Sequence, residues 1–216
     1  MTLATGWPKA GSRRAGGCGL AFVLLLLIGA GMASVPGGSE SVPSVRDYYE
    51  EHARVVVVSQ AVELVATLPL ICFLRGLAAS PLVRAKRAAV LAGGTLVLAS
   101  ILTLVPPLLL VVRHDDGSSN EVHAWAVLAD LTDVLLFAAI AAFAISHGWA
   151  GTWPPWLRWL ALLVGCLAAV RAVAILLEGV ALELAAPLAF IVLVIVLSIL
   201  MLRQQMRAAT EFVDHR

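Results

Sequence analysis

The sequence predicts an all-α integral membrane protein, a single domain of six transmembrane helices. Apolar residues make up 61% of the 216 positions, only 13% are charged, and the mean hydropathy is +0.94. A soluble domain has roughly 25% charged residues. The apolar residues also gather in runs long enough to cross a bilayer, which takes about 20 residues as helix. Because the runs are continuous and do not alternate, they favour helices over membrane strands.

Six runs follow one another along the chain and are the predicted spans: 19–35, 55–74, 88–112, 122–146, 156–178 and 184–202. The first run follows a few basic residues and ends in small residues at 31–33, so a cleaved signal peptide is the alternative there. The segment RDYYEEHAR at 46–54 is expected to form a short interfacial helix that leads into the second span.

Prolines and tryptophans mark positions within these spans. Pro106 and Pro107 predict a kink late in the third span, because proline lacks the N–H of a helical hydrogen bond. Pro155 is expected in the first turn of the fifth helix. Four tryptophans around that start predict an aromatic belt at a membrane boundary, with a stacking site for a ligand as the alternative. They are Trp149, Trp153, Trp156 and Trp159.

The distribution of Lys and Arg predicts the orientation. Eleven lie before the first span, in the connections after the second and fourth spans, and in the C-terminal tail, whereas three lie in the other connections. The positive-inside rule therefore places both termini in the cytoplasm. Thirteen arginines against two lysines, with abundant Ala, Leu and Val, are typical of a GC-rich bacterial genome, so we expect a bacterial cytoplasmic membrane.

Several classes of function are disfavoured. A net charge of +1 gives no basic footprint for nucleic acid. Cys18, Cys72 and Cys166 form no metal-binding or redox motif and are expected as apolar core residues. The chain has no serine-hydrolase elbow, zinc-protease helix, P-loop or DDxxD box. Asp130 and Asp133 supply fewer oxygens than a hard cation needs, so neither a metal nor a cofactor is expected.

Ionisable residues inside the predicted spans are the strongest functional signal. Each costs roughly 2.5–3.5 kcal/mol at the centre of a span and is a functional candidate by default. By position along their helices, all of them map to the extracytoplasmic half of the membrane. They are Glu63, Asp130, Asp133, Arg171, Glu178 and Glu183, the last two next to a tight turn.

Helical spacing places these residues on shared faces. The shared faces are His123, Asp130, Asp133 and Phe137 on the fourth span, Ser59, Glu63 and Thr67 on the second, and Arg171 and Glu178 on the fifth. We expect the faces to converge on a polar pocket with apolar walls. Because one arginine cannot balance three deep acids, at least one carboxyl is expected to be neutral and able to donate a proton.

A structural role is the alternative interpretation of these ionisable residues. Arg171 and one carboxylate can form an ion pair that locks the bundle, a contact worth about 0.6 kcal/mol. Glu178 and Glu183 are also consistent with solvated helix ends, and His123 with an interfacial residue.

Two stretches, YYEEHARVVVVSQAVELVATLPLICFLRGL at 48–77 and WPPWLRWLALLVG at 153–165, carry a resemblance to known sequences. In them the chain resembles a family of uncharacterised small membrane proteins common in actinobacteria. The shared pattern is an aromatic-acid-x-His entry to a helix, a Phe-x-x-x-Leu exit, and a Pro-x-Trp-Leu start. Membership implies no activity.

In size, helix count and isolated acids, the chain is also similar to the small membrane-embedded terpene cyclases, in which carboxylates start cyclisation by protonating an alkene or epoxide. The likeness implies Glu63, Asp130, Asp133 and Arg171 as catalytic residues. The residues expected to bind a lipophilic, isoprenoid-type substrate are Phe73, His123, Trp125, Phe137, Phe143 and Glu178. In this scheme Glu63 or Asp130 is the general acid, Asp133 tunes it, and Arg171 keeps the second carboxylate ionised.

Three hypotheses of function follow. We favour an enzyme for proton-initiated cyclisation or isomerisation of a lipophilic small molecule that enters from the bilayer. A proton-coupled carrier of a small solute is the first alternative, although the chain has no internal repeat and its acids lie on one side. An accessory subunit of a larger membrane complex is the second alternative, with protein partners unknown.

Overall fold

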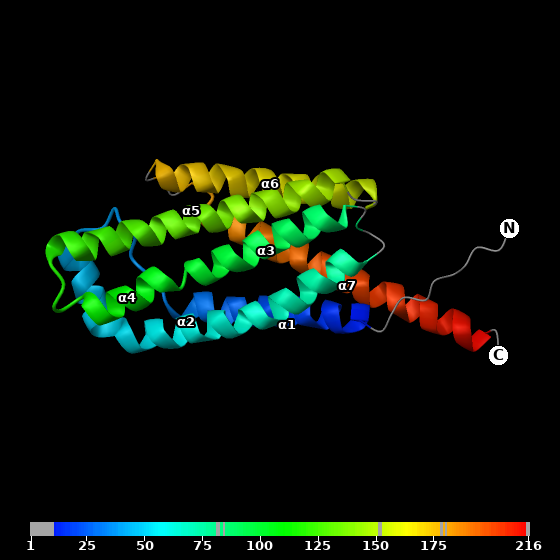
Figure 1. Cartoon of the computed structure of the whole chain (residues 1–216), viewed down its shortest axis with the longest axis horizontal. Coiled ribbons are helices and arrows are strands. Elements are labelled where there is room, and N and C mark those ends of the chain that lie inside the picture. The colour runs from blue at the N-terminus through cyan, green and yellow to red at the C-terminus, as the bar shows by residue number, and fades with distance from the viewer. Residues whose placement is uncertain are drawn as a thin grey trace.

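The computed structural model describes residues 11–80, 83, 85–150, 153–177, 179 and 181–214, and this part of the chain is built from α-helices (Figure 1). The helices are α1(Gly11–Met32), α2(Val42–Ala79), α3(Lys86–Leu102), α4(Val105–Arg113), α5(Ser119–Ala150), α6(Pro155–Leu176) and α7(Ala185–Asp214). With α3 and α4 taken together, the described residues hold six helical segments long and apolar enough to cross a membrane, as the sequence predicts.

Two details of the helices refine the sequence analysis. The predicted kink is a complete break: α3 ends at Leu102, a turn follows, and Pro106 and Pro107 lie in the first turn of α4. Their missing N–H groups would be unpaired at a helix start in any case, so the break accommodates them. The helix predicted at 46–54 is present, but it is the beginning of α2 itself, which runs without interruption from Val42, where Ser41 caps it, to Ala79.

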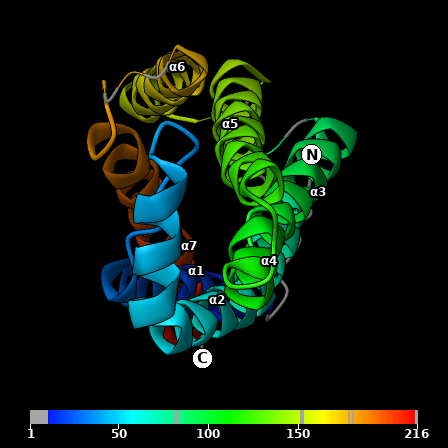
Figure 2. The same cartoon turned by 90° about the vertical axis from the view of Figure 1, so that its left-hand side faces the viewer.

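The helices form a ring that is visible when the bundle is viewed along its length (Figure 2). Around the ring, α1 packs against α2, α2 against α3 and α4, these against α5, α5 against α6, α6 against α7, and α7 against α1. Small residues allow two of the closest approaches. A Cβ added at Gly76 would lie 2.1 Å from the Cβ of Ala15, and one at Gly165 would lie 2.5 Å from Ile145 Cγ1.

The two ends of the ring differ. We call the end where α2 and α5 finish the basic end, and the end where they begin the acidic end. A large apolar core fills the basic half and draws on α1, α2, α3, α5, α6 and α7, with Phe73, Phe143 and Leu197 among its fully buried residues. A smaller, separate cluster around Tyr49 and Leu110 lies at the acidic end. The interior at the level between these clusters is where the charged residues lie.

The tryptophans at the basic end differ in their exposure to solvent. Trp149, Trp156 and Trp159 are exposed, as a membrane belt requires, but Trp153 is buried. Its ring stacks on His147 with 5.7 Å between centroids. His147 is a buried residue of α5 whose Nδ1 lies 2.8 Å from the carbonyl oxygen of Phe143.

Candidate functional site

Four predicted residues from three helices come together inside the ring, and we call Glu63, Asp130, Asp133 and Arg171 the acidic cluster. Asp133 on α5 interacts electrostatically with Glu63 on α2, with Asp130 one turn away, and with Arg171 on α6. Because α2 and α6 are not neighbours in the ring, a side chain of α5 that faces both must point into the interior. Asp133 is nevertheless solvent-accessible.

Glu63 is held where α1 comes close to α2. A Cβ added at Gly29 of α1 would lie 2.7 Å from Glu63 Cγ, so only a glycine fits beside this side chain. The hydroxyl of Ser59 donates a hydrogen bond of 2.9 Å to the Gly29 carbonyl and also interacts with the Glu63 carboxylate. The described residues place no cation in a salt bridge with Glu63. Asp130 forms no salt bridge in the described residues either, so both acids lack a cation of their own there, and Arg171 acts on Asp133.

Asp130 has a different environment, because it binds the connection between α1 and α2. The N–H of Gly38 donates a hydrogen bond of 2.8 Å to Asp130 Oδ2. A Cβ at Gly37 would lie 2.7 Å from Asp130 Oδ1, and one at Gly38 would lie 2.9 Å from Val127 Cα. No glycine in the described chain has a positive φ, so this pair is required for space and not for backbone conformation. Asp130 thus fixes the loop of residues 33–41 against α5.

Arg171 joins the cluster to the connection between α6 and α7. Its Nη1 donates to the carbonyl of Gly179 at 2.9 Å and more weakly to that of Ala181 at 3.5 Å. Its Nε is buried and has no hydrogen-bond partner in the described part of the chain. In the same turn, Leu182 adopts a positive φ of 61°. Arg171 therefore both holds the turn and presents positive charge to Asp133.

The remaining predicted residues are distributed elsewhere. Phe73 and Phe143 lie in the packed core of the basic half, and Phe137 packs against it. Since Phe73 is ten residues beyond the glutamate of the cluster, it lies about 15 Å from it along α2. Trp125 packs on the small apolar cluster at the acidic end. Phe73 and Phe143 therefore lie in the core and away from the acids, whereas Phe137 is one helical turn from Asp133.

Three other predicted residues need separate mention. His123 is exposed, which agrees with the interfacial interpretation. Glu183 is exposed, as a solvated helix end would be. Glu178 lies outside the described residues.

Sequence reasoning missed residues that complete the site. Gln60 follows Ser59 on α2, is buried, and has an Oε1 with no hydrogen-bond partner in the described residues. An amide in an apolar run was the available signal for it. Gly29, Gly37 and Gly38 were missed because their role is to leave room for other residues. No sequence pattern distinguishes them from the other glycines of the chain.

Neither a metal-binding arrangement of side chains nor a similar known protein indicates the function. The described residues hold no group of three or more His, Cys, Asp and Glu arranged to bind a metal ion. The chain matches no protein-family model, no curated protein and no solved structure. The acidic cluster is therefore the feature of this protein that points to a function.

Proposed function

We propose that the protein is a membrane-embedded enzyme that uses a carboxylic acid to protonate a lipophilic substrate and so starts its cyclisation or isomerisation. The observation that carries this proposal is the acidic cluster. Three carboxyl groups from two helices gather with one arginine, which acts on Asp133, and the described residues give Glu63 and Asp130 no salt bridge. A carboxyl group in such surroundings favours its neutral form and is then a proton donor.

The chemistry is balanced without a redox partner. Glu63 transfers its proton to a carbon–carbon double bond, which leaves a carbocation on the substrate and a carboxylate on the protein. After ring closure or a shift of the double bond, a different proton leaves the substrate and returns to a carboxylate of the cluster. In this proposal the positive charge of Arg171 favours the ionised form of Asp133, which then stabilises the cation, and the substrate lies beside the solvent-accessible Asp133.

The structure of the basic half favours a pocket over a pathway through the bundle. Beyond the cluster the ring is filled by a core in which Phe73, Phe143 and Leu197 are fully buried. A solute carried across the membrane would have to pass this core. For that reason we prefer the enzyme to the proton-coupled carrier.

We further propose that the acidic end faces the outside of a bacterial cytoplasmic membrane. Arg14, Arg75 and Arg158 are among the basic residues that gather at the opposite end, which is the end that the positive-inside rule places in the cytoplasm. A cysteine introduced at Ser118 should then react with a membrane-impermeant thiol reagent added to intact cells. A cysteine at Arg203 should react only after the cells are opened.

The proposed reaction is tested by solvent deuterium. Proteoliposomes with the full chain are incubated in D2O with farnesyl- and geranylgeranyl-bearing quinols, and the extracted lipids are examined by mass spectrometry. An acid-initiated reaction places solvent deuterium on a carbon of the product. We expect this label with the unmodified protein and its loss in Glu63→Gln.

The control is Glu50→Gln, which removes an exposed acid from the same helix and should retain the label. Absence of a labelled product, or full labelling by Glu63→Gln, would remove the proposal. If the vesicles instead show proton flux that is lost in Asp133→Asn, the carrier hypothesis replaces it.

A further inference from the structure

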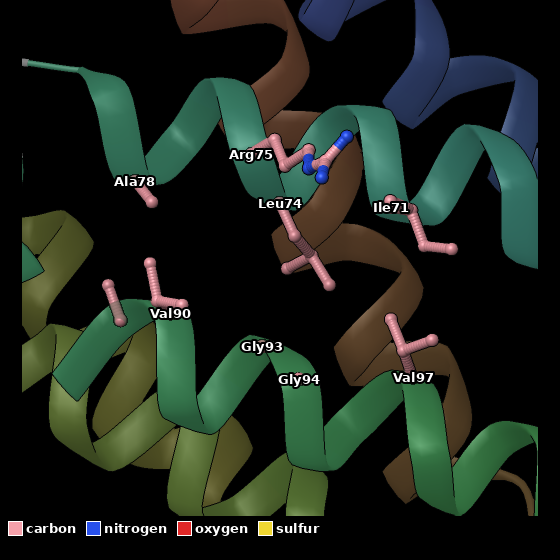
Figure 3. Close-up of a pocket in the computed structure, with 9 residues that line it drawn as sticks. Ile71, Leu74, Arg75, Ala78, Val90, Gly93, Gly94 and Val97 are labelled. Atoms are coloured by element: carbon pink, nitrogen blue, oxygen red, sulfur yellow. The ribbon is translucent and has the colours of Figure 1, made fainter. Parts of the chain in front are cut away.

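A groove lies between α2 and α3 in the basic half. Helix α1 packs against α2 elsewhere and does not line the groove. It has a volume of about 230 Å³. The residues that line it are Ile71, Leu74, Arg75, Ala78, Ala89, Val90, Gly93, Gly94 and Val97. Figure 3 shows the apolar side chains of the two helices facing each other across the space, with Gly93 and Gly94 on the α3 side. The absence of side chains at these glycines is what leaves the groove open.

The groove is long and lies at the depth of one membrane leaflet. Arg75 is four residues before the end of α2, which is about 6 Å, whereas Val97 is eleven residues after the start of α3, which is about 16 Å. The lining therefore extends from near the helix ends toward the middle of the bundle. Its dimensions suit an extended hydrocarbon chain whose polar end emerges beside Arg75.

The cations beside the groove have no counter-ion among the described side chains. Arg75, Lys86 and Arg87 are exposed, and none of them makes a salt bridge in the described chain. The sequence has no Asp or Glu from residue 64 to residue 114. Twelve of the fourteen acids are in the acidic half or its connections, and only Glu211 and Asp214 follow α7 toward its end. An anionic ligand would neutralise these three cations.

We propose that this groove binds an anionic phospholipid, with one acyl chain between α2 and α3 and the phosphate at Arg75. The guanidinium can donate two parallel hydrogen bonds to phosphate oxygens, and Lys86 and Arg87 add positive charge at the same membrane level. The apolar lining requires a hydrocarbon chain, so a lipid fits the site and a free phosphate ion does not. The inference is independent of the chemistry proposed for the acidic cluster.

Native mass spectrometry of the detergent-solubilised full chain tests the site with two lipids of equal chain length, dioleoylphosphatidylglycerol and dioleoylphosphatidylcholine. We expect tighter binding of the phosphatidylglycerol and an affinity about fivefold lower in Arg75→Gln, as the loss of one cation near an anionic headgroup implies. Gly94→Leu should weaken binding of both lipids at this site. Gly94 lines the groove and a Cβ there meets no atom within 4 Å, so this position has room for a side chain.

Each variant has a matched control. Arg203→Gln removes another exposed cation of the basic end, and Gly17→Leu adds a side chain at a second open glycine of the same half. Both should bind as the unmodified chain does. Equal affinities for the two lipids, equal effects of variant and control, or full competition by soluble glycerol phosphate would overturn the proposal.

Discussion

A hydrogen bond to Asp130 holds the loop between α1 and α2 against α5. A substitution at Gly37 tests how much this contact contributes to the free energy of unfolding. In Gly37→Ala the added Cβ would lie 2.7 Å from Asp130 Oδ1 and 3.3 Å from Oδ2, and no backbone atom is among its three nearest neighbours. The carboxylate must therefore rotate away. In doing so it gives up the hydrogen bond of 2.8 Å from the Gly38 N–H.

The expected cost follows from that bond. Hydrogen bonds to charged groups contribute about 1.5–3 kcal/mol when buried. Asp130 is only half-buried, so solvent screening reduces the value to about 1 kcal/mol. Gly37→Ala and Asp130→Ala should each lower the free energy of unfolding by about this amount. The double variant should lose no more than Asp130→Ala alone, because the clash disappears with the carboxylate and alanine restricts the unfolded chain.

Thermal unfolding of the detergent-solubilised chain, followed by tryptophan fluorescence, is the measurement. A change of 1 kcal/mol lowers Tm by about 2–4 °C in a chain of this size. Each single variant should therefore unfold about 2–4 °C below the unmodified protein, and the double variant no lower than Asp130→Ala. If the two decreases add in the double variant, Gly37 and Asp130 are energetically independent and the described contact does not hold the loop.

Two further predictions concern the interior. Arg171→Gln should destabilise the fold by roughly 1–2 kcal/mol, because the Gly179 carbonyl and Asp133 both lose their positively charged partner, and Asp133→Asn should recover part of that loss in thermal unfolding. Gly76→Ala should lower the free energy of unfolding further, by about 2 kcal/mol or more, because its Cβ would lie 2.1 Å from that of fully buried Ala15. Chemical denaturation measures this loss. A variant as stable as the unmodified chain would show that α1 and α2 can separate without cost.

The opposite characters of the two ends of the ring make the fold asymmetric along its axis. At the basic end the interior is a dry core, and the unbalanced cations lie on the outside near the helix ends. At the acidic end the carboxyl groups lie inside, and loops held by Asp130 and Arg171 border them. The two proposed sites follow from this difference: proton chemistry inside the acidic half, and lipid binding on the outer surface of the basic half.

Much of this protein is determined by sequence alone, because hydropathy, proline and the cost of a buried charge act locally. The run lengths predict six spans, Pro106 and Pro107 mark the break between α3 and α4, and helical spacing places Asp130 and Asp133 at the level of Glu63. These properties do not depend on which helices become neighbours.

The order of helices around the ring, and therefore the role of each acid, was decided only by tertiary packing. Asp130 and Asp133 are equivalent candidates in the sequence, yet one accepts a backbone N–H from a residue 92 positions away and the other faces Glu63 and Arg171. A backbone donor is present at nearly every position, so a partner of that kind leaves no mark in the sequence. Phe73, expected beside the acids, instead packs in the core of the basic half. About 15 Å of helix separates it from Glu63, so the two residues lie at different levels of the ring.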